Sequence, residues 1–272
     1  MITFFRRSWR TAGLRKNMKN YIILILVSWI GIANSDELRE NFDRRKRNEF
    51  AEELLQSKKV DIVVGQGAEG SNALKVYYKG FEHGSKRVVA SQLLDQSYDT
   101  ATLEFKVKFC DVFNFTKGGK LHGLGPLHPI TGGKPITPTG WSARLMFTQG
   151  GGLMTYVYHQ DMKGKFGDTR KAENFRFEPN KYYQIKMMVR MNSLPDIADG
   201  KVVVNVNGEN LISHEKIRFR SVVNNDSSIN KFLFSTFHGG STKEWAPVDG
   251  EGNYATECAY FDDFIVKNNL GK

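Results

Sequence analysis

An arginine, a serine and two tyrosines lie at alternate positions in two runs that flank a glycine-rich segment. Ser142 and Arg144 precede residues 149–152, and Tyr156 and Tyr158 follow them. If a three-residue loop joins the runs as a β-hairpin, opposite positions have numbers with an even sum. Because side chains alternate between the faces of a strand, this register places all four on one face. A two-residue loop would divide them between the two faces.

Together with Lys120, these residue types suit β-elimination in a polyuronate. The reaction removes the proton next to a carboxylate, and that proton is too weakly acidic while the carboxylate keeps its full charge. We expect Lys120, Ser142 and Arg144 to neutralise the carboxylate and to stabilise the charge of the transition state. A tyrosine whose pKa is lowered by these cations can accept the proton, and a neutral tyrosine can protonate the leaving oxygen. Tyr156 and Tyr158 are the candidates for these two roles.

The same pattern also has an ordinary structural explanation. A hairpin that carries an arginine and two tyrosines often forms a solvent-facing surface with cation–π and cross-strand contacts. The spacing alone therefore does not distinguish a catalytic site from a structural surface. The neighbouring motifs are needed to separate the two.

The elements that would position these residues are β-strands. From about residue 60 onward, short β-rich runs alternate with Gly, Pro and Asn, and long amphipathic helices are absent. The strand candidates are residues 73–78, 87–91, 102–110, 141–148, 153–159, 182–191, 202–205, 210–217, 232–237 and 258–266. This pattern predicts an all-β fold, a β-jelly roll built as a two-sheet concanavalin-like sandwich.

The N-terminal part is expected to lie outside this domain. Residues 1–35 combine a basic stretch with an apolar run over 21–33 that is too short to span a bilayer, which is typical of a signal peptide. Small residues at Ala33 and Ser35 predict cleavage before Asp36. An uncleaved signal anchor and a start at Met18 remain alternatives. Residues 36–65 are interpreted as a charged helical lead-in or linker, and residues 66–272 as the jelly-roll domain.

Charge and export together limit the choice of partner. Removal of residues 1–35 deletes six Lys and Arg residues and no Asp or Glu, so the formal net charge falls by six, from +10 to +4. This charge, without a basic helix or an aromatic RNA-binding motif, argues against nucleic acid. We expect a secreted, extracellular monomer that binds an acidic polysaccharide and has no stable membrane insertion after signal cleavage.

The chain contains two cysteines, Cys110 and Cys258, each at a strand-like run. In an oxidising compartment they can form a disulfide that ties an early strand to the last one. Two separate buried thiols are the alternative. No cysteine spacing indicates a zinc site.

Five motifs occur in a fixed order along the chain. They are Gly-Gly-Lys-Leu at 118–121, Trp-Ser-Ala-Arg-Leu-Met at 141–146, Tyr-Val-Tyr-His-Gln at 156–160, Phe-Ser-Thr-Phe-His-Gly-Gly at 234–240 and Trp-Ala-Pro at 245–247. This ordered set resembles polysaccharide lyase family 14, whose members are β-jelly-roll enzymes acting on alginate or glucuronan. The resemblance implies that Lys120, Ser142, Arg144, Tyr156 and Tyr158 are catalytic and that no metal or other cofactor is obligatory. Lys117 is the second candidate for the role of the lysine.

Further side chains near these motifs are candidates for contacts with the sugar chain. They are Lys117, His122, Gln149, Gln160, His238, Lys243 and Trp245. His122 and His238 depart from the family pattern, which usually has a proline and a bulky aromatic residue at these positions. Turn, surface and core roles are the ordinary alternatives for these residues.

Two other functions occur on sandwiches of this kind. A glycoside hydrolase needs two carboxylates facing each other across a groove, whereas the neighbouring Asp262 and Asp263 should point to opposite faces of a strand. A secreted, non-catalytic carbohydrate-binding protein on the same fold remains the alternative, although such a protein would tolerate loss of the tyrosines or the lysine.

Overall fold

The computed structural model describes residues 36–268, and these residues are mostly β-strands in two antiparallel sheets. The predicted signal peptide and the alternative start at Met18 lie outside the described residues. Within 36–268, no helix has the length and apolar character needed to cross a membrane.

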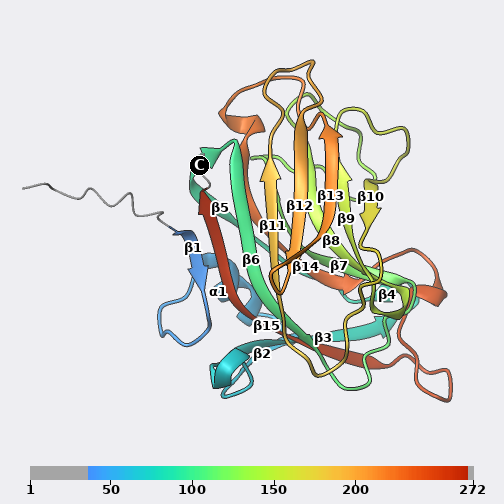
Figure 1. Cartoon of the computed structure of the whole chain (residues 1–272). Coiled ribbons are helices and arrows are strands. Elements are labelled where there is room, and N and C mark those ends of the chain that lie inside the picture. The colour runs from blue at the N-terminus through green and yellow to red at the C-terminus, as the bar shows by residue number, and fades with distance from the viewer. Residues whose placement is uncertain (1–35, 269–272) are drawn as a thin grey trace, which may run out of the picture. The chain divides into compact units, whose positions relative to one another are not determined.

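The larger sheet has nine strands and forms one layer of the sandwich (Figure 1). Its main order is β13-β12-β11-β6-β15-β3-β2, while β1 pairs with β15 and β4 pairs with β3. The strands are β1 (Asp36–Glu40), β2 (Val60–Val63), β3 (Ala73–Phe81), β4 (Gly84–Ser85), β6 (Thr100–Phe109), β11 (Tyr183–Arg190), β12 (Gly200–Val206), β13 (Glu209–Ile217) and β15 (Thr256–Asn268).

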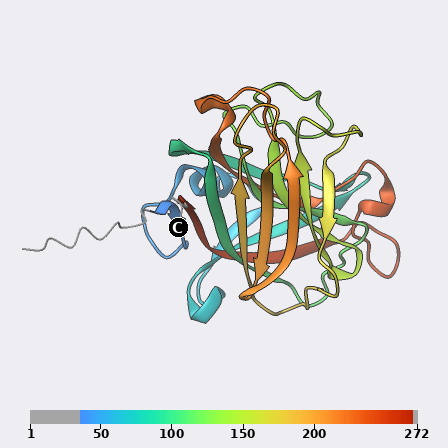
Figure 2. The ribbon, with the colours of Figure 1, turned by 45° about the horizontal axis from the view of Figure 1, so that its top comes forward.

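The smaller sheet has six strands in the order β10-β9-β8-β7-β14-β5. They are β5 (Val88–Tyr98), β7 (Gly118–Gly125), β8 (Ser142–Thr148), β9 (Leu153–Tyr158), β10 (Asp168–Lys171) and β14 (Ile229–His238). Figure 2 shows the same two layers from a second direction. The predicted two-sheet sandwich is confirmed, and every strand-like run that the sequence indicated is a strand.

The core lies between the two sheets and follows the alternation of the strands. On β6, Leu103, Phe105 and Val107 are fully buried, and on β8 Leu145 and Phe147 are fully buried. Burial of a side chain of this size contributes about 1.5–3 kcal/mol relative to exposure. The same alternation sends the polar residues of β8 and β9 to the other face of the small sheet.

The N-terminal segment contains a short helix, as expected, but it also contributes strands to the larger sheet. Its only α-helix is α1 (Glu49–Leu55), and it is flanked by strands β1 and β2. Leu38, Phe42 and Phe50 belong to the buried core cluster. The spacing of these apolar residues resembles a helical stripe, but Phe42 has a left-handed φ of 59° and pairing of β1 with β15 buries Leu38. Tertiary pairing therefore outweighs local helix propensity here.

The two cysteines form a disulfide, which confirms the first of the two predicted alternatives. Cys110 follows β6, Cys258 lies on β15, and their Cα atoms are 5.4 Å apart. The Cys110 N–H also donates to the Cys258 carbonyl at 2.9 Å. Because 148 positions separate the two residues, the cross-link closes a long loop and restricts the unfolded chain strongly.

Three short 3-10 helices lie in the loops that matter for the site. They are η2 (Gln149–Gly151) at the turn between β8 and β9, η3 (Asn225–Ser227) before β14, and η4 (Lys243–Trp245) after β14. A fourth, η1 (Ala68–Gly70), precedes β3.

Candidate active site

The β8–β9 hairpin places four of the candidate residues on the outer face of the small sheet. Ser142 is opposite Tyr158, and Arg144 is opposite Tyr156. The Thr148 N–H donates to the Gly152 carbonyl at 2.7 Å, so three residues form the loop, as predicted. Two of them, Gly150 and Gly151, have φ values of 69° and 84°, a region that glycine adopts without a steric cost.

The neighbouring strand β7 brings Lys120 to the same face. Lys120 is opposite Met146, but Gly123 is opposite Arg144, so the register shifts between Lys120 and Gly123. The Lys120 Nζ lies 3.4 Å from the centre of the Tyr156 ring and donates to Met146 Sδ at 2.9 Å. Three strands thus supply the five-residue cluster of Lys120, Ser142, Arg144, Tyr156 and Tyr158.

The two tyrosines contact each other through their hydroxyl groups. The Tyr156 and Tyr158 hydroxyls are 3.3 Å apart, and their rings are nearly perpendicular. Tyr158 is fully buried, and its hydroxyl accepts the Gly133 N–H at 2.9 Å. Tyr156 is only half-buried. Tyr156 is therefore the tyrosine that can reach a bound molecule in this conformation.

Ser142 is held by the same loop that holds Tyr158. Its hydroxyl donates to the Ile130 carbonyl at 2.7 Å, and its side chain is fully buried. Residues 126–141, between β7 and β8, therefore cover this part of the cluster. The Ser142 hydroxyl already has an acceptor for its proton, so it fixes the loop above the site.

Arg144 is a buried cation without a carboxylate partner in the part of the chain that the structure describes. Its side chain is 6% exposed, and its buried Nε has no acceptor among the described residues. No ion pair within residues 36–268 includes it. Burial lowers the pKa of Arg144, and a buried charge is costly unless an opposite charge compensates it. The site is therefore preorganised to receive an anion.

Lys120 carries a strongly lowered pKa. Burial is the main cause, and the positive charges of Arg144 and Arg87 lower it further, so that the pKa of Lys120 is about 6. Its amine is therefore mostly neutral at pH 7 when the site holds no anion. A neutral amine can accept a proton, which an ordinary lysine cannot do at this pH.

Tyr156 shows the opposite shift from the one expected for a tyrosine near cations. Burial and the hydrogen bond with Tyr158 raise its pKa, and the charge of Arg144 lowers it by less. Tyr156 is therefore protonated at neutral pH. A protonated phenol is suited to donate a proton rather than to accept one.

The structure does not bring His122 to the outer face of the sheet. His122 is fully buried, its ring lies 4.2 Å from that of Phe234 and 4.8 Å from that of Phe105, and its Nδ1 accepts the Ser235 N–H. The register shift in β7 turns this side chain towards the core. Burial holds the pKa of His122 well below its usual value, so a direct contact with substrate is not supported.

His238 is also a core residue. Its ring stacks on Phe113, its Nε2 is 2.7 Å from the Asn114 carbonyl, and the side chain is fully buried. Burial lowers its pKa to about 4. Strand alternation on β14 places Phe237, rather than His238, on the outer face. The expected sugar contact by His238 is therefore corrected to a packing role.

Gln160 joins loops instead of facing the cluster. Its amide donates to the Thr137 and Phe219 carbonyls at 3.0 and 3.1 Å, and its Oε1 accepts from Ser221. These partners occupy the amide, so Gln160 holds the loop over the site in place.

The remaining candidates, Lys117, Lys243 and Trp245, gather around η4. Lys117 is exposed and pairs with Glu244 at 3.7 Å. Lys243 and Trp245 belong to η4, and Thr116 Oγ1 donates to the Trp245 carbonyl. Because Lys117 already has an acidic partner and Lys120 contacts Tyr156, the structure favours Lys120 for the role of the lysine.

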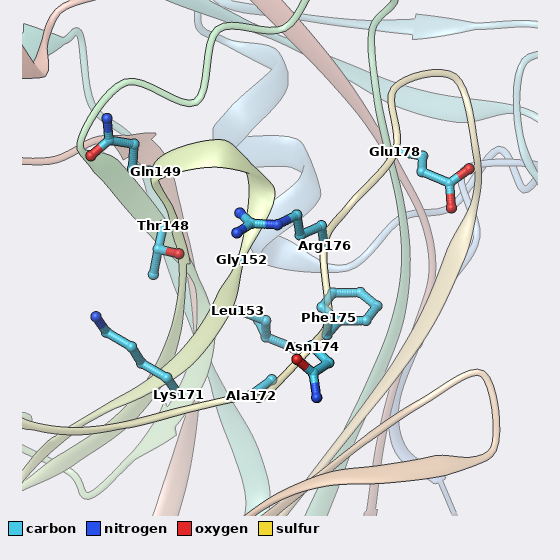
Figure 3. A pocket seen from close by; sticks show the side chains of 10 residues that line it. All are labelled: Thr148, Gln149, Gly152, Leu153, Lys171, Ala172, Asn174, Phe175, Arg176 and Glu178. Atoms are coloured by element: carbon cyan, nitrogen blue, oxygen red, sulfur yellow. The ribbon is translucent and has the colours of Figure 1, made fainter.

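Gln149 lies at the hairpin turn, beside a pocket of about 670 Å³ (Figure 3). The lining residues are Thr148, Gln149, Gly152, Leu153, Lys171, Ala172, Asn174, Phe175, Arg176 and Glu178. Figure 3 shows the Arg176 side chain directed towards the turn, where it donates to the Gly150 carbonyl, while Glu178 points away and pairs with Lys181. No member of the five-residue cluster lines this pocket.

Among the described residues, the acidic side chains Asp262 and Asp263 lie away from the cluster. Asp262 and Asp263 lie on β15 of the other sheet, where Asp262 accepts from Ser71 and Asp263 pairs with Lys106. Within residues 36–268, no group of three or more His, Cys, Asp or Glu side chains is placed to hold a metal ion.

Comparison with known proteins identifies the family. The model of the family Polysaccharide lyase 14 matches residues 67–264, although no curated protein sequence matches this chain. The fold is similar to that of the PL-14 alginate lyase from Aplysia kurodai, with a TM-score of 0.63 and 22% identity over 85% of this chain and 98% of that chain.

Two further solved structures share the fold. A double mutant of the alginate lyase Aly36B, in complex with alginate tetrasaccharide, has a TM-score of 0.65 and 19% identity over 85% of this chain and 96% of that one. An endo-beta-1,4-glucuronan lyase from the fungus Trichoderma reesei has a TM-score of 0.58 and 12% identity, with coverage of 86% and 96%. Since the family model spans most of the fold and includes all five cluster residues, this chain belongs to polysaccharide lyase family 14.

Proposed function

We propose that this protein cleaves a polyuronate by β-elimination at the five-residue cluster. The observation that carries the proposal is the buried, unpaired guanidinium of Arg144 beside Lys120 and Tyr156. A carboxylate of the substrate supplies the missing anion. It can accept charge-assisted hydrogen bonds from the guanidinium, which are stronger than neutral ones.

Arg144 has the role of neutralising the uronate carboxylate. Partial neutralisation makes the proton on the adjacent carbon more acidic, and it stabilises the negative charge that develops when this proton leaves. Ser142 contributes by holding residues 126–141 above the site through its bond to the Ile130 carbonyl. The loop excludes water from the guanidinium and so strengthens its interaction with the carboxylate.

Lys120 is proposed as the base and Tyr156 as the acid. These roles differ from those expected from the sequence, where Lys120 was a partner of the carboxylate and a tyrosine was the base. The reason is the pKa of about 6 for Lys120 and the raised pKa of Tyr156. Tyr158 orients Tyr156 through the contact between their hydroxyls.

The reaction can then be followed bond by bond. The Lys120 amine takes the proton from the carbon next to the carboxylate, and the electron pair of that C–H bond forms a carbon–carbon double bond. The bond from the neighbouring carbon to the glycosidic oxygen breaks, and Tyr156 gives this oxygen a proton. Return of the proton from Lys120 to Tyr156, directly or through solvent, restores the starting state.

The substrate class follows from the family and the charge of the site. Alginate and glucuronan both carry a carboxylate on each sugar residue, and the similar solved structures are named as alginate and glucuronan lyases. Secretion as a monomer is part of the same proposal. The disulfide between Cys110 and Cys258 supports an oxidising compartment.

A panel of polymers tests the substrate class. The protein without residues 1–35 is incubated with polymannuronate, polyguluronate and glucuronan, and the absorbance of the unsaturated product is followed. We expect a steady rise with at least one polymer. No rise with any of them, while the polymers still bind, would leave a non-catalytic carbohydrate-binding protein.

A further inference from the structure

A row of side chains crosses the outer face of the small sheet and passes through Lys120. On one side of Lys120, Met146 and Met154 lie at opposite positions on the next strands, β8 and β9. On the other side, Phe237 of β14 is opposite Lys120. The row therefore runs perpendicular to the strands, from the edge near β10 towards β5.

Arg87 extends this row beyond Phe237. Thr236 of β14 is opposite Val88 of β5, and the two strands are antiparallel. Arg87, the residue before Val88, therefore lies beside Phe237, the residue after Thr236. Its guanidinium carbon is 5.4 Å from the centre of the Phe237 ring. Since neighbouring strands are about 4.8 Å apart, the backbones at Arg87 and Lys120 are separated by roughly 10 Å.

The guanidinium of Arg87 is exposed and has no acidic partner among residues 36–268. The Lys59 amine donates to the backbone carbonyl of Arg87 and not to its side chain. By contrast, Arg218 and Arg220 pair with aspartates.

The positive charge of Arg87 also acts on the active site. It contributes to the lowered pKa values of Lys120 and Arg144. Arg87, directly before β5, and Arg144 on β8 thus carry positive charges on the face that holds Lys120, and no acidic side chain among residues 36–268 pairs with either of them. Such an arrangement can bind more than one anionic group of the same ligand.

We propose that Arg87 binds the carboxylate of a uronate residue further along the sugar chain than the one held by Arg144. This assignment rests on the proposed function, because a polyuronate carries a carboxylate on every sugar residue. A chain that follows the row across the strands passes from the cluster to Arg87. Stacking on Phe237 limits the movement of the guanidinium, so it loses less conformational freedom on binding.

The test compares Arg87→Gln with the matched variant Lys86→Gln. Lys86 is the preceding residue, is also exposed, and its Nζ lies 4.1 Å from the centre of the Phe81 ring. Kinetic constants are measured on the polymer that the unmodified protein cleaves and on oligouronates of decreasing length. We expect Arg87→Gln to raise KM about tenfold with little change in kcat. The difference should disappear for oligomers too short to reach Arg87.

The dependence of kcat/KM on pH provides a second readout. Loss of the Arg87 charge raises the pKa of Lys120, so the acid limb of kcat/KM should move to higher pH in Arg87→Gln and stay in place in Lys86→Gln. Equal KM values for both variants on every substrate length would overturn the role of Arg87 while leaving the lyase intact.

Failure of the proposed function is distinguishable from failure of this inference. If the unmodified protein cleaves no polyuronate, the lyase proposal fails, and binding of the same polymers is then measured by calorimetry. Weaker binding by Arg87→Gln than by Lys86→Gln supports the anion-binding role, whereas equal affinities overturn it.

Discussion

The amine nitrogen of Lys120 lies 3.4 Å from the centre of the Tyr156 ring, and the two side chains have pKa values shifted in opposite directions. Burial disfavours the charged form of both groups, so it lowers the pKa of the lysine and raises that of the tyrosine. At neutral pH both groups are mostly uncharged. This pairing of a neutral amine with a protonated phenol is the basis for assigning the base and the acid.

Arg144→Ala should abolish most turnover. Loss of the guanidinium leaves the substrate carboxylate without its partner, and we expect kcat/KM to fall by about 10²–10³, as for other groups that stabilise developing charge. The fold should survive, because the guanidinium is a buried charge without an acidic partner in this structure. Steady-state kinetics and thermal unfolding measure both effects. Near-normal activity in the folded variant would exclude the proposed neutralisation of the carboxylate.

The activity should depend on a group with a pKa near 6 in the free enzyme. Lys120 must be neutral to accept a proton, so kcat/KM should rise as the pH increases through about 6 and level off above it. A profile of kcat/KM from pH 4 to 9 on a polyuronate measures this limb. The uronate carboxylates titrate at lower pH and should not obscure it. Activity that falls as the pH rises through 6 would require protonated Lys120 and would contradict its role as the base.

Tyr156→Phe should remove the proton donor while keeping the ring under the Lys120 amine. We expect kcat to fall by about 10²–10⁴. The matched control is Tyr77→Phe on β3, because Tyr77 is also half-buried but lies in the other sheet. Both variants should unfold at a similar temperature, and only Tyr156→Phe should lose turnover. Retained kcat in Tyr156→Phe would assign the acid to another group.

Lys120→Met should stabilise the fold in a pH-dependent manner. The pKa of Lys120 is lowered in the folded state, so between about pH 6 and 10 the unfolded chain binds more protons, and stability rises with pH in this range. The cost of burying the amine is therefore largest below pH 6 and disappears near pH 10. Unfolding temperatures at pH 5.5 and pH 9.5 measure the effect. The gain from Lys120→Met should be greater at pH 5.5, and an equal gain at both values would argue against the lowered pKa.

Much of the site could be predicted from alternation alone. The loop of three residues between β8 and β9 sets an even register, and this register brings Ser142, Arg144, Tyr156 and Tyr158 to one face. Two features of the sequence make this register predictable. The glycines at the turn mark the loop, and the apolar residues between the polar ones mark the buried face.

The position of Lys120 could not be predicted in the same way. Strand β7 contains four glycines in its eight residues, and glycine weakens the local signal for a strand. Its pairing with β8 and β14 holds it in the sheet. The register shift after Lys120 also depends on these neighbours, and it explains why His122 was expected in the site but lies in the core.

The roles of the residues depended on burial, which the sequence did not reveal. Proximity to cations suggested a lowered pKa for the tyrosines. The structure adds the burial of Lys120 and Tyr156, and this outweighs the effect of the neighbouring charges on Tyr156. In the N-terminal segment, the expected helix covers only Glu49–Leu55, because residues 36–40 pair with β15 as a strand.

Mass spectrometry of the products formed from a polyuronate in ¹⁸O-labelled water tests the central claim most directly. Elimination forms a carbon–carbon double bond and adds no water, so we predict products with an unsaturated end, without ¹⁸O from the cleavage, and their absence when Arg144→Ala replaces the unmodified protein. Saturated products that carry one ¹⁸O for each bond cleaved would show hydrolysis and contradict the account.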